Sequence, residues 1–222
     1  MPRDPAERSL DETIAALVGD LAPVKPLRPG FGIAAGLGAT ALAVLGVWLV
    51  VGFRADILAG HPAPIVIARG AVLLTAGACM LLAAVRAAIP GRPDQSASLA
   101  GTLLLGLFPI GLMGLLLQGI MVSRTPSFAE VDGFGAARCF AIAAASGLSV
   151  GAALVVWMRR AAPTDLPRAG WLTGWAAGAL GTFAYSLFCP ASTPGFITTV
   201  YPAAMLIVAV LIRLAVPRLV RW

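Results

Sequence analysis

The most reactive side chains in this sequence belong to three cysteines, Cys79, Cys139 and Cys189. Arg138 directly precedes Cys139, and a nearby cation lowers the pKa of a thiol and so raises its thiolate fraction. Thiolates react with oxidants and bind soft metal ions. Pro190 follows Cys189 and should stiffen the turn that carries it. The chemistry open to this chain is therefore thiol chemistry, and the compartment that the cysteines face decides its outcome.

Other kinds of chemistry lack the residues that they need. His61 is the only histidine, and the cysteines are too far apart in sequence for a C-x-x-C redox pair or for zinc-type spacing. Glycine-rich phosphate loops, paired intramembrane carboxylates and a serine–histidine arrangement are also missing. We therefore expect no catalytic residue, no bound metal and no cofactor, and we predict that the protein is not an enzyme.

The composition is that of an integral membrane protein. Of the 222 residues, 59% are hydrophobic and 12% are charged, whereas an ordinary soluble domain carries charge on about a quarter of its residues. The 16 Lys and Arg outnumber the 10 Asp and Glu. They stand singly between apolar runs, without interleaved aromatic residues, which argues against direct binding of nucleic acid. The lipid bilayer is the first expected partner.

Six apolar stretches are long enough to cross a bilayer, which takes about 20 residues. They cover residues 31–53, 65–89, 98–122, 137–158, 171–188 and 198–216. The fifth is the shortest and is rich in Gly and Thr. Most Lys and Arg fall on one side of the membrane if the N-terminus is cytoplasmic, as the positive-inside rule requires. We predict an all-α, polytopic bundle of six transmembrane helices with both termini in the cytoplasm.

This topology places two of the cysteines on the outer side. The outer loops are then about 54–64, 123–136 and 189–197, so Cys189 lies in the last of them and Cys139 at the outer end of the fourth span. Their thiols can approach each other if the fourth and fifth spans are neighbours. A permanent disulfide, or two inert boundary cysteines, stays an open alternative. Cys79 falls in mid-membrane, where we expect it to pack as a small apolar residue.

Small residues recur at four-residue spacing within the spans and predict close approach of helix backbones. The pairs and triplet are Gly32 and Gly36, Gly147 and Gly151, and Gly170, Gly174 and Gly178. Ionisable residues are almost absent from the spans. Arg69, Arg138 and Arg213 lie near span ends, where long side chains can extend to the membrane surface. A small six-span transporter or channel is thus weakly supported, because transporters usually keep ionisable groups in mid-membrane, but it stays the alternative function.

Residues 1–29 precede the membrane domain, which we assign to residues 30–222. Ser9 and Glu12 form a capping-box pattern, and apolar residues then recur at helical spacing, which predicts a short amphipathic helix over about 9–21. Its apolar stripe consists of Leu10, Ile14, Leu17, Val18 and Leu21. A proline-rich spacer follows. Helices that lie on membranes usually carry Lys and Arg on the polar face, whereas this one is acidic, which favours a protein partner over the membrane surface or the protein's own inner loops.

Several stretches together resemble the NrsF-like family of six-span inner-membrane proteins, which are negative regulators (anti-sigma factors) of extracytoplasmic-function sigma factors. They are "LVGDLAPVKPLRP" at 17–29, Cys139 at the start of the fourth span, "LFCP" at 187–190 and "PRLVRW" at 217–222. Their order, with the number of spans and the length, covers nearly the whole chain.

The resemblance implies a membrane-bound anti-sigma factor in the cell inner membrane, which holds its sigma factor until stress is sensed outside. The sigma-factor-binding residues would be Leu10, Ile14, Leu17, Val18, Leu21, Pro23 and Val24. The sensing residues would be Cys139 and Cys189, with Arg138 beside them. The particular sigma factor, the inducing oxidant or heavy metal, and whether the protein forms a homo-oligomer stay open.

Overall fold

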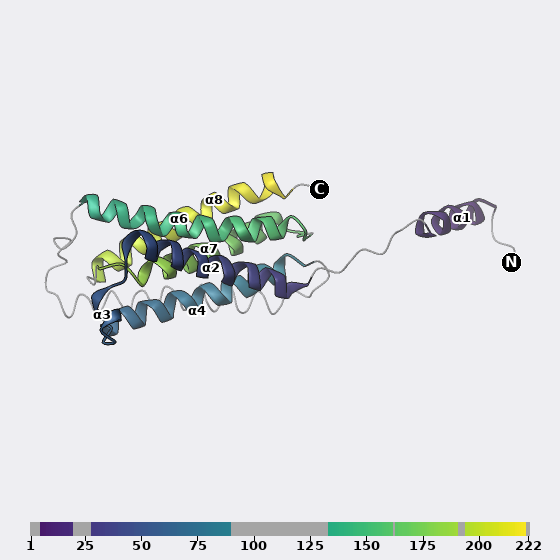
Figure 1. Cartoon of the computed structure of the whole chain (residues 1–222). Coiled ribbons are helices and arrows are strands. Elements are labelled where there is room, and N and C mark those ends of the chain that lie inside the picture. Colours follow the sequence, from purple (N-terminus) through teal and green to yellow (C-terminus); the bar gives the residue numbers. More distant parts are fainter. Residues whose placement is uncertain (1–4, 20–27, 90–132, 162, 191–193, 221–222) are drawn as a thin grey trace.

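The computed structural model describes residues 5–19, 28–89, 133–161, 163–190 and 194–220 (Figure 1). The helices are α1 (Pro5–Gly19), α2 (Pro29–Val51), α3 (Ala55–Leu58), α4 (Pro64–Ala87), α6 (Gly133–Met158), α7 (Leu166–Ser186) and α8 (Pro194–Leu219). No strand occurs in these ranges. The predicted all-α class is therefore confirmed for the described part of the chain.

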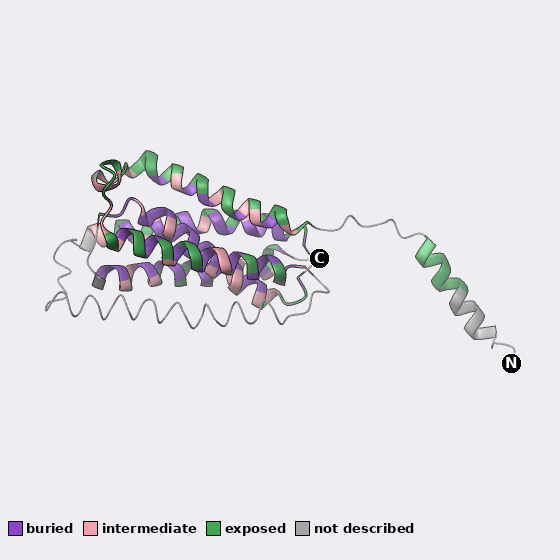
Figure 2. Ribbon diagram, turned by 90° about the horizontal axis from the view of Figure 1, so that it is seen from below, coloured by how far each residue is buried: buried purple, intermediate pink, exposed green. Residues whose placement is uncertain are grey.

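The five long helices after α1 form one bundle, with α7 at its centre. Among the described elements, α7 packs against α2, α4, α6 and α8. Figure 2 shows buried residues facing the interior of the bundle and exposed residues on its outside. Most of α7 is buried, including Ala176, Leu180 and Ala184, which are 0% exposed. Among the described helices, this central one corresponds to the fifth predicted span, 171–188, which is the shortest and is rich in Gly and Thr.

Four helices among the described residues are long and apolar enough to cross a membrane. They are Pro29–Val51, Pro64–Ala87, Gly135–Met158 and Phe196–Leu219, and they correspond to the first, second, fourth and sixth predicted spans. The third, 98–122, lies outside the described residues. The fifth is present as α7, although α7 is not one of the four. Its Gly and Thr residues lower its hydropathy, and they face other helices rather than lipid. The count of six spans stays a prediction.

Glycine makes the predicted close approaches of helix backbones. A Cβ atom added at Gly174 would lie 2.6 Å from the Ala209 Cα atom, and one at Gly178 would lie 2.9 Å from the Met205 carbonyl oxygen. A Cβ at Gly181 would overlap the backbone of Gly147. Side chains would separate α7 from α8 and from α6 at these points.

Prolines begin several of these helices, because the first helical position needs no backbone donor. Pro29 starts α2, Pro64 starts α4 and Pro194 starts α8. Two glycines with positive φ, Gly52 at 80° and Gly60 at 75°, flank the turn around α3. Only glycine adopts such angles at little cost. They reverse the chain between α2 and α4.

The helix before the membrane domain begins earlier than expected. Because α1 runs from Pro5 to Gly19, Ser9 lies inside the helix and the predicted capping box is wrong. Pro5 at the first position explains the earlier start. The side chains of Ile14, Leu17 and Val18 are 49%, 65% and 60% exposed. Leu21, Pro23 and Val24 lie outside the described residues, as does the Leu10 side chain.

Candidate functional site

Cys139 and Cys189 lie in one buried cluster at the end of the bundle that carries α3, here called the α3 end. The cluster includes Tyr185 near the end of α7 and Tyr201 in α8. The Cys139 side chain lies within hydrogen-bonding reach of Cys189 and Tyr185. The chain has two tyrosines, and both are in this cluster. We call Cys139, Tyr185, Cys189 and Tyr201 the thiol cluster.

The crossing of α6 and α7 explains why the two cysteines meet. The helices approach most closely where Gly181 lies against the backbone of Gly147. Cys139 is eight residues before Gly147, and Cys189 is eight residues after Gly181. The two helices run in opposite directions (Figure 1). The eight residues from Cys139 to Gly147 span about 12 Å of helix, and the turn after Ser186 carries Cys189 past the end of α7, so both cysteines lie on the same side of the crossing, toward the α3 end.

None of the three cysteines forms a disulfide in the structure. Cys139 and Cys189 are only 8% and 0% exposed, and burial in apolar surroundings makes a thiol less reactive. Arg138 is exposed, so its side chain lies outside the buried thiol cluster. Cys79 is half-buried in α4 and is not part of that cluster. Arg138 therefore precedes Cys139 in the sequence but is not buried with it.

The buried cation at this end is Arg69, which is 1% exposed. Its Nη2 atom donates hydrogen bonds to the Ser186 carbonyl oxygen at 2.7 Å and to the Cys189 carbonyl oxygen at 2.9 Å. Its guanidinium carbon lies 5.9 Å from the centre of the Tyr201 ring. The expected extension of Arg69 to the membrane surface is wrong. The side chain turns inward because the last carbonyls of α7 lack helical partners and carry the negative end of the helix dipole.

A second arginine reaches the same carbonyl from the loop around α3. Arg54 donates from Nη1 to the Cys189 carbonyl oxygen. Its Nε and Nη2 atoms donate to the Asp56 carboxylate at 2.9 and 3.0 Å, as a two-pronged pair. This hydrogen bonding lowers the pKa of Asp56 from 3.8 to about 2. Asp56 is therefore ionised at neutral pH and orients Arg54 toward Cys189.

A crevice of about 500 Å³ opens beside this contact. Its lining includes Phe53, Arg54, Asp56, Phe188 and Pro190. The Phe53 and Phe188 rings lie 4.9 Å apart, centre to centre. The crevice therefore borders the residues on both sides of the Cys189 peptide.

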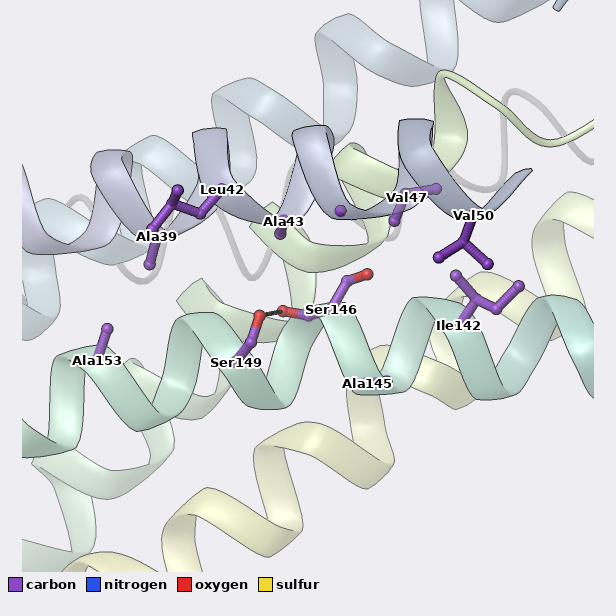
Figure 3. Close-up of a pocket in the computed structure, with 11 residues that line it drawn as sticks. Ala39, Leu42, Ala43, Val47, Val50, Ile142, Ala145, Ser146, Ser149 and Ala153 are labelled. Carbon is purple, nitrogen blue, oxygen red and sulfur yellow. Dashed lines mark hydrogen bonds between the residues drawn. The ribbon is translucent and has the colours of Figure 1, made fainter. Parts of the chain in front are cut away.

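A larger groove of about 560 Å³ runs between α2 and α6 (Figure 3). Figure 3 shows Ala43 and Val47 of α2 facing Ser146 and Ile142 of α6 across it. The Ser149 hydroxyl donates to the Ser146 carbonyl oxygen at 2.7 Å, within α6. Among the residues that the structure describes, those lining this groove carry no charge. Its surface suits lipid chains better than a polar substrate.

Sequence reasoning missed Arg54, Arg69, Tyr185 and Tyr201. One signal was available for Arg69. An arginine within an apolar span costs free energy unless polar groups of the protein bind its guanidinium group. The two tyrosines stand four residues before Cys189 and twelve after it. Nothing in that spacing assigns them to Cys139, because the contact depends on how α6 packs.

Comparison with protein families adds the identity of the chain. Residues 17–222 match the NrsF family, described as negative regulator of sigma F. The chain belongs to this family. The resemblance noted in the sequence is thereby confirmed, although the match begins at Leu17, after Leu10 and Ile14. Comparisons with curated proteins and with solved structures found no match.

Membership in the NrsF family gives the chain a function in transcription control. The family consists of negative regulators of a sigma factor, so a sigma factor is the expected protein partner. A regulator family agrees with a non-enzymatic role. The four apolar helices are compatible with a protein that crosses the membrane several times.

Proposed function

We propose that this NrsF-family protein is an inner-membrane anti-sigma factor of an extracytoplasmic-function sigma factor. Its N-terminal segment sequesters the sigma factor in the cytoplasm. Oxidant or heavy-metal stress, sensed by Cys139 and Cys189 on the periplasmic side, releases it. The observation that carries the proposal is the family match over nearly the whole chain. The topology, the type of sigma factor and the two sites are the proposed parts.

The capture surface is the apolar stripe of α1 with the residues that follow it. Ile14, Leu17 and Val18 are exposed side chains on a helix of 15 residues. Such a short helix is marginal in water unless its apolar side chains pack against a surface. The acidic residues of this segment favour a protein partner over anionic lipid. Leu10, Leu21, Pro23 and Val24 extend the surface along the chain.

The sensing step is a change of state at the Cys139–Cys189 pair. An oxidant can take two electrons and two protons from the pair, which then becomes a disulfide while the oxidant is reduced. A soft metal ion can instead bind both sulfur atoms as thiolates, with release of two protons. Either reaction joins the start of α6 to the turn after α7 through the two sulfur atoms. Contact between the two side chains in the resting protein supports this proposal.

Capture is tested by co-purification in detergent. The full chain is expected to retain its sigma factor, and Leu17→Asp is expected to lose it because the substitution puts a charge into a desolvated contact. Truncating an interface anchor typically costs about 2 kcal/mol or more, which corresponds to roughly thirtyfold weaker binding. Arg8→Ala, on the same helix but off the stripe, is the matched control.

Two results would contradict the proposal. One is normal retention of the sigma factor by Leu17→Asp at wild-type protein levels. The other is a substrate flux into vesicles that survives removal of residues 1–22, which would favour a transporter.

A further inference from the structure

We propose that Arg69 and Arg54 are positioning residues of the thiol cluster: their guanidinium groups hold the Cys189 carbonyl, and so keep the Cys189 side chain against Cys139. This inference rests on the proposed sensing function and names residues outside it. The two arginines come from different segments, α4 and the loop before α3, and converge on one peptide group.

The position of Cys189 explains why it needs an external anchor. α7 ends at Ser186, so Cys189 lies beyond the last helical residue. Its backbone N–H still bonds to the Tyr185 carbonyl oxygen at 3.2 Å, which fixes one side of the residue. On the other side, the carbonyl takes its hydrogen bonds from Arg69 and Arg54. Both sides of Cys189 are thus held, although it belongs to no helix.

Burial of Arg69 is costly, which argues that it has a specific task. A cation taken out of water needs compensation from the groups around it. Carbonyl oxygens at the end of α7 and the face of the Tyr201 ring contribute to that compensation. The same bonds join α4 and α8 to the turn that carries Cys189. An apolar residue at position 69 would pack there at less cost but could not hold this turn.

The test measures thiol positions directly in the detergent-solubilised full chain. In a Cys79→Ala background, dibromobimane links two neighbouring thiols: each thiolate displaces one bromide, and two C–S bonds form. The arginine-containing protein is expected to be cross-linked. Because a misplacement of about 1 Å can cost up to about 100-fold in rate, Arg69→Gln is expected to slow cross-linking by about tenfold or more.

Three comparisons separate positioning from general loosening. Arg69→Lys keeps a cation at the end of α7 and is expected to restore most of the rate. Arg86→Gln, an exposed residue of the same helix, is expected to leave the rate unchanged. Single labelling by monobromobimane should not fall in Arg69→Gln, because positioning changes the distance between the thiols and not their chemistry.

Equal cross-linking in Arg69→Gln and the unsubstituted protein would overturn the inference. If Arg69→Gln does not accumulate in the membrane, Arg54→Gln decides, because it removes a donor to the same carbonyl from a loop. Severalfold slower cross-linking then supports the inference, and an unchanged rate overturns it. A separate result would contradict the sensing proposal while leaving the positioning inference intact. In that case the thiols still cross-link, but Cys139→Ser and Cys189→Ser strains respond normally to stress.

Discussion

Cys139 and Cys189 are almost inaccessible, and this restricts what can act on them. A buried thiol reacts more slowly than an exposed one, and small reagents that can enter the bundle reach it most readily. The crevice beside Arg54 and Pro190 opens next to the turn that carries Cys189. A small oxidant or a single metal ion fits this requirement. The burial also explains how the pair could stay reduced in an oxidising compartment until a suitable reagent arrives.

The cysteines make the first prediction at this scale. Cys139→Ser and Cys189→Ser are each expected to abolish stress induction of the sigma-dependent genes, because either substitution leaves a single thiol that can neither form the disulfide nor chelate a metal. Cys79→Ser should respond like the wild type, since Cys79 lies outside the thiol cluster. The measurement is a promoter reporter with and without oxidant or cadmium. Full induction in both Cys139→Ser and Cys189→Ser would show that these cysteines do not sense the stress.

Sequence could anticipate the cysteine pair but not its surroundings. Consecutive spans cross the membrane in opposite directions. The start of the fourth span, with Cys139, and the end of the fifth, with Cys189, are therefore predicted to lie on the same side. The order of the spans does not say which way a side chain such as Arg69 turns. Extension to the surface and inward capping of α7 are equally compatible with its place in the sequence. The choice depends on α7 and α8 lying next to α4, which is a property of the packed bundle.

At the scale of helices, α7 and the segment before α2 were the hardest to predict. α7 has low hydropathy because it is rich in Gly and Thr, and these small residues suit packing against four neighbouring helices. Hydropathy reports how well side chains suit lipid, and a central helix contacts little lipid. α1 starts at Pro5 because a proline there is a stronger signal than the capping pattern at Ser9. The bounds of α2 and α4 were predicted to within about two residues, whereas α6 and α8 each begin four residues earlier than predicted.

The glycine contacts of α7 yield a prediction of stability. Gly174→Ala places a methyl group 2.6 Å from the Ala209 Cα atom, so α7 and α8 must move apart. Overpacking of this kind costs about 1–3 kcal/mol, and the thermal unfolding temperature in detergent should fall. Gly46→Ala is the matched control, because a Cβ at Gly46 in α2 meets nothing within 4 Å. Equal unfolding temperatures for the two variants would show that α7 and α8 can separate freely.

The whole molecule has two distinct ends. Arg159, just after α6, donates from Nε to the Leu219 carbonyl oxygen at the end of α8, at 2.9 Å. The start of α2 lies at this same end, whereas α3 and the thiol cluster lie at the other (Figure 1). The arrangement agrees with a topology in which the segments before α2 and after α8 share one compartment.

Reporter fusions test which compartment that is. A reporter active only in the cytoplasm is expected to work when fused after Trp222, and one active only in the periplasm is expected to work at position 193. The reason is the excess of Lys and Arg in the segments assigned to the inside. Activity of the periplasmic reporter at Trp222 would reverse the topology and place the thiol cluster in the cytoplasm.

The crossing at Gly147 and Gly181 also has a mechanical consequence. The two backbones touch there without intervening side chains, so the contact can act as a fulcrum. The segments that lead from it to Cys139 and to Cys189, here called arms, are each eight residues long. Eight residues beyond it on the far side are Val155 of α6 and Thr173 of α7, both buried. If α6 and α7 rotate as rigid rods, closing the cysteine arms opens the opposite arms by a similar amount. A covalent bond near the α3 end would then widen the gap between α6 and α7 at the opposite end of the bundle, where α2 begins.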